Sequence, residues 1–273
     1  MNKVISKDGT TIAYDKQGKG PAVILVAGAL CSRLSWSGPE LSTLLSSHFT
    51  VYNYDRRGRG DSGDIQPHTV QKEIDDIEAL IDEAGGSAYL WGHSSGGSLA
   101  LEAAVKLRDK VKKLAFYEAP YNDNPQDKPG WREYINQLKK DLAANRRGDA
   151  VALFMRYVGT PVEQIEGMKQ SPMWAGMEAI APTFAYDHIE ILRNDRAIPI
   201  NQASLVSVPT LAMTGDTTDP FIQDATKILS NVIPHAQLCI VEGQSHAVDV
   251  KVIAPMLVKF FKGSEAQKEN ATN

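Results

Sequence analysis

The chain contains the stretch Ala88-Tyr89-Leu90-Trp91-Gly92-His93-Ser94-Ser95-Gly96-Gly97, which runs into a segment rich in small residues. Apolar residues followed by Gly-x-Ser-x-Gly and a helix are typical of a nucleophile elbow, a strained turn that exposes a serine hydroxyl. Glycine is needed on both sides, because a Cβ there would strike the neighbouring strand or helix. The pattern predicts Ser94 as a nucleophile. An ordinary strand-to-helix turn with a capping serine is the alternative, since one short motif is a weak signal.

Strand and helix candidates alternate on both sides of this turn. An N-terminal hairpin is expected around Asp8-Gly9. Further strands are expected at residues 22–26, 49–54, 111–117, 209–215 and 237–243, with helices between or after them. This βαβα order with apolar strands predicts a mostly parallel sheet that is flanked by helices on both faces.

One stretch, from about residue 121 to 201, interrupts the alternation of strands and helices and contains no clear strand. Apolar residues recur there at helical spacing, and one of the expected helices runs from Phe184 to Leu192. We therefore expect an α/β core of residues 1–120 and 202–263, an inserted helical cap or lid of residues 121–201, and a flexible tail of residues 264–273. Such a lid would lie over the carboxyl edge of the sheet, where open α/β proteins bind ligands.

Soft and aromatic side chains in the expected lid indicate an apolar substrate group. Packing of the lid onto the core is the alternative role for each of them. The residues are Met155, Met168, Met173, Trp174, Met177, Phe184 and Tyr186.

Composition limits the classes of protein that this chain could be. Its 273 residues, 42% hydrophobic and 23% charged, are typical of a soluble globular protein. The formal charge of −4 provides no basic face for nucleic acid. The N-terminus has no signal-peptide pattern and no apolar run is long enough to span a membrane, so we expect a cytoplasmic protein with a small-molecule substrate. No metal-ligand spacing or dinucleotide fingerprint stands out, and we expect no metal or cofactor. The oligomeric state stays open.

A serine nucleophile needs a base, and the base needs an acid that orients it. His246 lies just beyond the last expected strand, and Asp219 lies just beyond the strand before it. The order Ser94, Asp219, His246 is the one expected for a triad on this kind of sheet. Asp216 and Glu118 are the other candidates for the acid, and we favour Asp219.

Acyl transfer also needs two backbone N–H groups that hold the developing oxyanion. The residue after the nucleophile, Ser95, is expected to supply one. The loop after the strand at residues 22–26 is expected to supply the other, from Ala29.

The chain resembles the α/β-hydrolase fold along nearly its whole length, and is most similar to serine hydrolases with a helical cap. The resemblance rests on Tyr54-Asp55-Arg56-Arg57-Gly58-Arg59-Gly60-Asp61-Ser62, on Gly92-His93-Ser94-Ser95-Gly96 and on Gly243-Gln244-Ser245-His246. Two departures stand out. Ala27-Gly28 replaces the usual His-Gly, and Thr218 occupies the usual place of the acid, with Asp219 one residue later.

The resemblance implies hydrolysis of a carboxylic ester or lactone through an acyl-enzyme on Ser94. Perhydrolysis or C–C bond hydrolysis by the same triad is one alternative. A ligand-binding protein with slow turnover on the same scaffold is another, because function does not follow from fold.

Overall fold

The strand β3 (Ala22–Val26) explains why the central sheet is covered on both faces. All five residues are buried; Val23 and Leu25 pack into one core cluster, and Ile24 and Val26 into the other. Alternate side chains of a strand point to opposite faces, so an unbroken apolar run is stable only with cover on both. The architecture is taken from a computed structural model, which describes residues 1–263.

Eight strands form one sheet in the order β1-β2-β4-β3-β5-β6-β7-β8. The strands are β1 (Asn2–Ile5), β2 (Thr11–Gly18), β3 (Ala22–Val26), β4 (Thr50–Tyr54), β5 (Ala88–His93), β6 (Val111–Tyr117), β7 (Thr210–Gly215) and β8 (Ala236–Val241). The pairs β1–β2 and β2–β4 are antiparallel, and the other neighbours are parallel. The predicted hairpin and mostly parallel sheet are confirmed.

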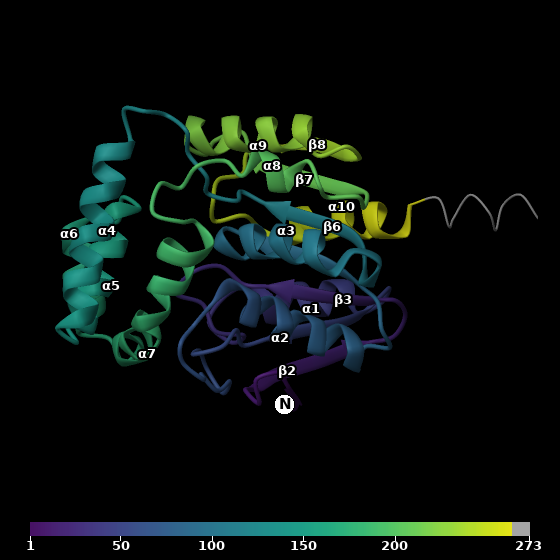
Figure 1. Ribbon diagram of the computed structural model, residues 1–273, viewed down its shortest axis with the longest axis horizontal. Helices are drawn as coiled ribbons and strands as arrows, with labels where there is room; N and C mark the ends of the chain where they lie inside the picture. The colour runs from purple at the N-terminus through teal and green to yellow at the C-terminus, as the bar shows by residue number, and fades with distance from the viewer. Residues whose placement is uncertain (264–273) are drawn as a thin grey trace, which may run out of the picture.

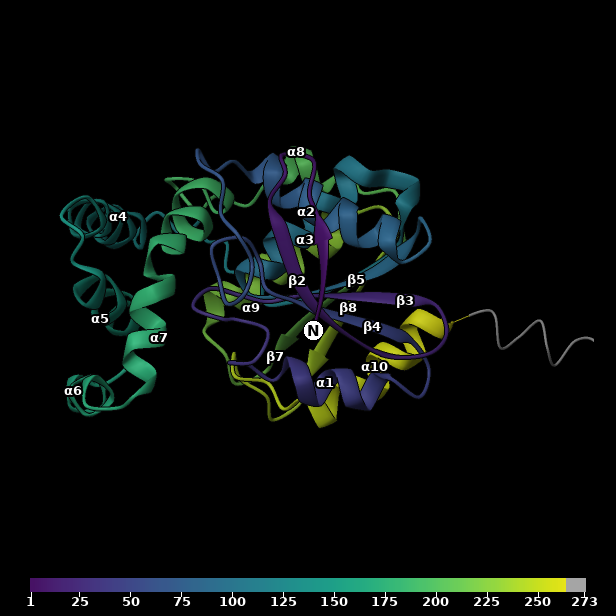
Figure 2. The ribbon, with the colours of Figure 1, turned by 90° about the horizontal axis from the view of Figure 1, so that it is seen from below.

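Helices cover both faces of this sheet. They are α1 (Gly38–Leu45), α2 (Val70–Glu83), α3 (Ser95–Leu107), the 3₁₀ turn η1 (Arg108–Lys110), α8 (Ile200–Ala203), α9 (Pro220–Val232) and α10 (Val250–Lys262). Figure 2 shows α1 and α10 on one side of the sheet, with α2 and α3 on the other. This arrangement confirms the α/β-hydrolase fold that the sequence predicts. None of the helices in residues 1–263 has the length and apolar character needed to cross a membrane.

The chain from α4 to η3, called the insertion below, is helical. It contains α4 (Lys128–Ala143), α5 (Arg147–Tyr157), α6 (Val162–Lys169), α7 (Met173–Ile180), the 3₁₀ turn η2 (Ala181–Thr183) and the π-helix η3 (Ala185–Ile191). Figure 1 shows α4 to α7 beside the edge at which the parallel strands end. The helix expected from Phe184 to Leu192 is present as η3, and π-helices often occur at functional sites. The expected tail at 264–273 lies outside the described residues.

A buried histidine lies at the centre of the insertion. The side chain of His188 is 4% exposed, and its Nδ1 is 2.8 Å from the hydroxyl of Tyr134. Its ring stacks on Phe184, with centroids 5.6 Å apart, and on Phe154 at 5.2 Å. Burial, which disfavours the charged form, lowers the pKa of His188 from 6.5 to about 4.

This lowered pKa predicts an acid-sensitive fold. Between pH 6.5 and about 4 the unfolded chain binds a proton that folded His188 does not, so the free energy of unfolding falls as the pH falls. His188→Phe should remove this component, worth at most about 1.4 kcal/mol per pH unit. The measurement is urea unfolding at several pH values. Ile165→Val is the control, because it removes buried apolar surface from α6 of the insertion and leaves the hydrogen-bond and ring partners of His188 in place, so it should keep the pH dependence of wild type. An unchanged slope in His188→Phe would contradict the prediction.

Candidate active site

The predicted elbow is present between β5 and α3. Ser94 has φ 56° and ψ −130°, a left-handed conformation that non-glycine residues rarely adopt. A Cβ on Gly96 would lie 2.2 Å from the carbonyl oxygen of Val26, and one on Gly92 would lie 2.4 Å from the carbonyl oxygen of Gly96. Both glycines are therefore required sterically, as the sequence indicated. The turn leaves Ser94 partly exposed at the start of α3.

The loop after β3 lies directly beside this serine. A Cβ on Gly28 would be 3.0 Å from the Cβ of Ser94, so the loop approaches this serine closely. Within residues 1–263, the backbone N–H groups of Ala29 and Ser95 donate to no other protein group. The two predicted oxyanion donors thus lie on the two segments that flank Ser94, and both are free to donate.

His246 lies on the loop after β8, and the side chains that hold this loop include three at the ends of β5 and β6. Its Nδ1 is 2.7 Å from Oε2 of Glu118, the residue after β6. Nε2 of His93 is 3.0 Å from the backbone oxygen of His246, and the Tyr117 hydroxyl donates to the backbone oxygen of Ser245 at 2.7 Å. The Nδ1 contact leaves Nε2 of His246 available for proton exchange.

Glu118 is a fully buried carboxylate with four partners. Besides His246, it accepts hydrogen bonds from the N–H of Gly215 at 2.8 Å and from the hydroxyls of Thr214 and Thr218 at 3.2 and 3.1 Å. Burial alone would raise the pKa of Glu118, but the hydrogen bonds from His246 and Gly215 outweigh burial and hold the pKa below its ordinary value. The carboxylate is therefore ionised beside the imidazole at neutral pH.

This geometry differs from the expectation for Asp219. The side chain of Asp219 is exposed at the start of α9, and no hydrogen bond or ion pair joins it to His246 within residues 1–263. Asp216 is also exposed and accepts a hydrogen bond from the N–H of Gly243 at 2.7 Å. The acid that faces His246 is the third candidate, Glu118. Its position at the end of β6 is the sequence signal for it, since the carboxyl ends of parallel strands meet at one edge.

In the described part of the chain, no direct hydrogen bond joins Ser94 to His246. Such bonds are often long without substrate and tighten when it binds. The arrangement contains a serine hydroxyl on a strained turn, an imidazole held by a buried carboxylate, and two free N–H donors. These are the components that acyl transfer needs.

The insertion residues expected to line an apolar site do not share one role. Phe184 is fully buried and packs on Phe154, with ring centroids 4.8 Å apart, whereas Met173 is 63% exposed. Two hollows of about 680 and 780 Å³ open on the insertion, and neither is lined by Ser94 or His246. Packing is the role that the structure gives to Phe184.

Comparison with known proteins identifies the class. A model of the alpha/beta hydrolase family matches residues 23–251, and the chain belongs to this family. The crystal structure of an alpha/beta hydrolase from Sphaerobacter thermophilus is 43% identical, with a TM-score of 0.83, and the match covers 95% of this chain and 100% of that one.

Two curated relatives match more locally. A zearalenone hydrolase from Cladophialophora bantiana is 30% identical over 130 residues, which are 45% of this chain and 48% of the relative. A putative carbamate hydrolase, RutD, from Caulobacter sp. is 36% identical over 123 residues, 42% of this chain and 45% of the relative. The chain spans about half the length of the curated relatives it matches.

The steric role of the elbow glycine is testable. Gly96→Ala places a Cβ against two backbone oxygens, those of Val26 and Ala27, and should lower the free energy of unfolding by about 1–3 kcal/mol. Gly63→Ala is the matched control, because the nearest atom to its new Cβ, on Thr10, is at an ordinary 3.5 Å. Denaturant unfolding measures both. Equal stability of the two variants would argue against the close approach of α3 to β3.

Proposed function

We propose that the protein hydrolyses a carboxylic ester or lactone through an acyl-enzyme on Ser94. The observation that carries the proposal is the pairing of His246 with the buried carboxylate of Glu118 at 2.7 Å, beside a serine on a strained elbow. In this proposal Glu118 replaces Asp219 as the acid of the triad.

The reaction has two halves. The Ser94 hydroxyl attacks the substrate carbonyl as His246 accepts its proton, and the N–H groups of Ser95 and Ala29 hold the oxyanion. Collapse of the tetrahedral intermediate breaks the bond to the leaving oxygen, which takes the proton from His246. Water then attacks the acyl-enzyme, with His246 again as base, and releases the acid and free Ser94. Glu118 stabilises the imidazolium in both halves.

The substrate class is drawn from the relatives and from the insertion. The names of the two curated relatives, zearalenone hydrolase and putative carbamate hydrolase, are consistent with attack at an acyl carbonyl that bears a heteroatom. Residues 121–201 act in this proposal as a lid that favours an apolar acyl or alcohol group. Esters of graded chain length test the preference for an apolar group, and carbamates test the breadth of the acyl class.

Labelling by a fluorophosphonate probe tests the nucleophile. The wild-type protein should be labelled, because an activated serine attacks the phosphorus. Ser94→Ala and His246→Ala should not be, since they lack the nucleophile and the base. Mass spectrometry of the labelled peptide identifies the modified residue. Folded wild type that resists the probe and hydrolyses no ester or lactone would refute the proposal and favour a ligand-binding protein.

A matched pair of variants tests the acid. Glu118→Gln should lower kcat by about 10³-fold or more, because an amide cannot stabilise the imidazolium. Asp219→Asn should stay within about twofold of wild type, because its side chain is exposed and away from His246. Steady-state hydrolysis of a p-nitrophenyl ester measures both. A large loss in Asp219→Asn with little change in Glu118→Gln would reverse the assignment.

A further inference from the structure

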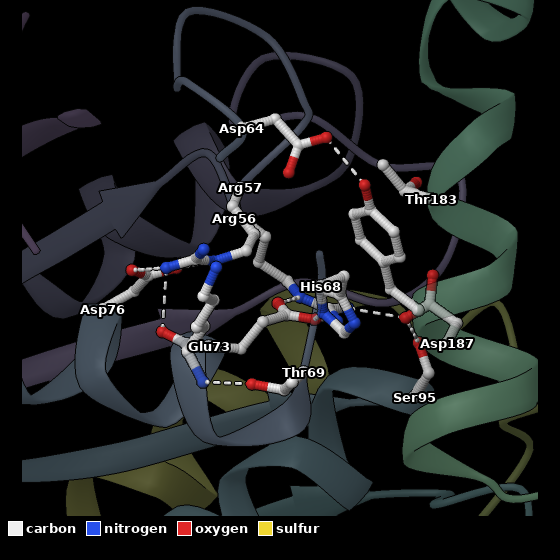
Figure 3. Close-up of polar contacts among 12 residues, drawn as sticks. Arg56, Arg57, Asp64, His68, Thr69, Glu73, Asp76, Ser95, Thr183 and Asp187 are labelled. Carbon is white, nitrogen blue, oxygen red and sulfur yellow. Dashed lines mark hydrogen bonds and ion pairs between the residues drawn. The ribbon is translucent and has the colours of Figure 1, made fainter. Parts of the chain in front are cut away.

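One carboxylate of the insertion is buried against the catalytic core. Asp187, on η3, is fully buried, and its Oδ1 accepts hydrogen bonds from Arg56 at 2.7 Å and from the Ser95 hydroxyl at 2.9 Å. Its Oδ2 accepts from Arg59 at 2.6 Å. Figure 3 shows Asp187 on the insertion helix, facing Arg56 and Ser95. A lone buried carboxylate is costly, so three donors from the core indicate a specific docking point.

The side chains of Arg56 and Arg59 connect Asp187 to the loop after β3. Nη1 of Arg59 donates to the backbone oxygen of Gly28 at 2.6 Å and approaches that of Cys31 at 3.4 Å. Nη1 of Arg56 donates to the backbone oxygen of Ala27 at 3.2 Å. The guanidinium groups therefore bind three carbonyls of the loop that carries the oxyanion donor.

The contact at Gly28 determines the direction of that donor. The carbonyl of Gly28 and the N–H of Ala29 belong to one peptide group, which is planar and trans. A donor that fixes the carbonyl therefore fixes the N–H on the opposite side. Donation to the carbonyl also polarises the peptide, which strengthens the N–H as a donor.

The other oxyanion donor belongs to Ser95, whose hydroxyl is bound by the same carboxylate. Asp187 is thus linked to the Ser95 N–H by its hydrogen bond with the Ser95 hydroxyl. It is linked to the Ala29 N–H by Arg59, which binds both Asp187 and the carbonyl of Gly28. One side chain of the insertion is linked to both.

We propose that Asp187 is a positioning residue of the oxyanion hole, holding the Ala29 and Ser95 N–H groups in register through Arg59 and its own contact with Ser95. The inference rests on the proposed function. In it, the insertion is part of the catalytic apparatus as well as the cover of the substrate site.

Charge balance explains why a carboxylate is needed here. Arg56 also forms a bidentate ion pair with Glu73. Within residues 1–263, Arg59 is paired with one carboxylate, that of Asp187. Burial acts to raise the pKa of Asp187, but the charges of Arg56 and Arg59 hold it below its ordinary value. Without the carboxylate, Arg59 is left buried and unpaired, and its contact with Gly28 loses its anchor.

The test compares two Asp→Asn variants on one p-nitrophenyl ester. Asp187→Asn should lower kcat by about 10- to 100-fold, less than the loss of a whole donor, with KM within about threefold. Asp76→Asn is the matched control. Asp76 is equally buried and paired with Arg57, at 2.6 and 2.8 Å, but this pair reaches neither the loop after β3 nor Ser95 (Figure 3). The control should keep kcat within about twofold, although both variants lose stability.

Affinity for an alkylboronic acid provides a second readout. Its tetrahedral adduct on Ser94 places a boron-bound oxygen where the oxyanion forms, so its affinity should fall in proportion to kcat/KM in Asp187→Asn and not in Asp76→Asn. If Asp187→Asn does not fold, Arg59→Lys takes its place. It keeps the charge but loses the fork that binds Gly28 and Asp187 together, and should show the same loss of kcat.

The outcomes separate the two proposals. Active wild type with a kcat loss confined to Asp187→Asn or Arg59→Lys supports the inference. Active wild type in which both Asp→Asn variants keep kcat, lose it equally, or change only KM overturns the inference and leaves the proposed function in place. Wild type that neither hydrolyses esters nor accepts the fluorophosphonate overturns both.

Discussion

The buried carboxylate of Glu118 is the interaction on which the arrangement of the site depends. It follows β6, accepts hydrogen bonds from the end of β7 through Gly215 and from the loop after it through Thr218, and binds His246 from beyond β8. A buried charge without such partners would be strongly destabilising. The same contacts that compensate the charge therefore bring three strand ends together and hold His246 beside His93, the residue before Ser94.

Much of this could be predicted from the sequence because the decisive signals are local. The elbow is readable since steric conflict at Gly92 and Gly96 arises within one strand-turn-helix unit and its neighbour. The apolar run of β3 indicates a strand with both faces covered. Ser94 and His246 both follow parallel strands, and the carboxyl ends of such strands meet at one edge, which explains why the two residues could be expected on the same side of the sheet.

The acid and the insertion contacts could not be predicted in the same way. Asp216, Asp219 and Glu118 all follow strands, and only the register of β6 on β7, with Tyr117 opposite Met213, makes Glu118 the one that meets His246. Asp187 lies 131 residues from Arg56 in sequence, within a helix whose periodicity shows which side is apolar but not which polar group is buried. Pairing over such separations depends on how the insertion docks, which local patterns do not contain.

The two buried carboxylates place different electrostatic demands on the fold. Glu118 faces an imidazole, which gains a proton in the proposed reaction, so the stabilisation that Glu118 provides is greatest when His246 is protonated in the transition state of that proposal. Asp187 faces guanidinium groups that stay charged at every step. The first pair can therefore contribute differential binding, whereas the second can contribute only constant geometry. If the proposed reaction holds, the ion pair of Asp187 keeps a constant charge beside the oxyanion donors, and the ion pair of Glu118 changes with the charge of the base. This division is expected of a preorganised site, since reorientation of dipoles during the reaction would raise the barrier.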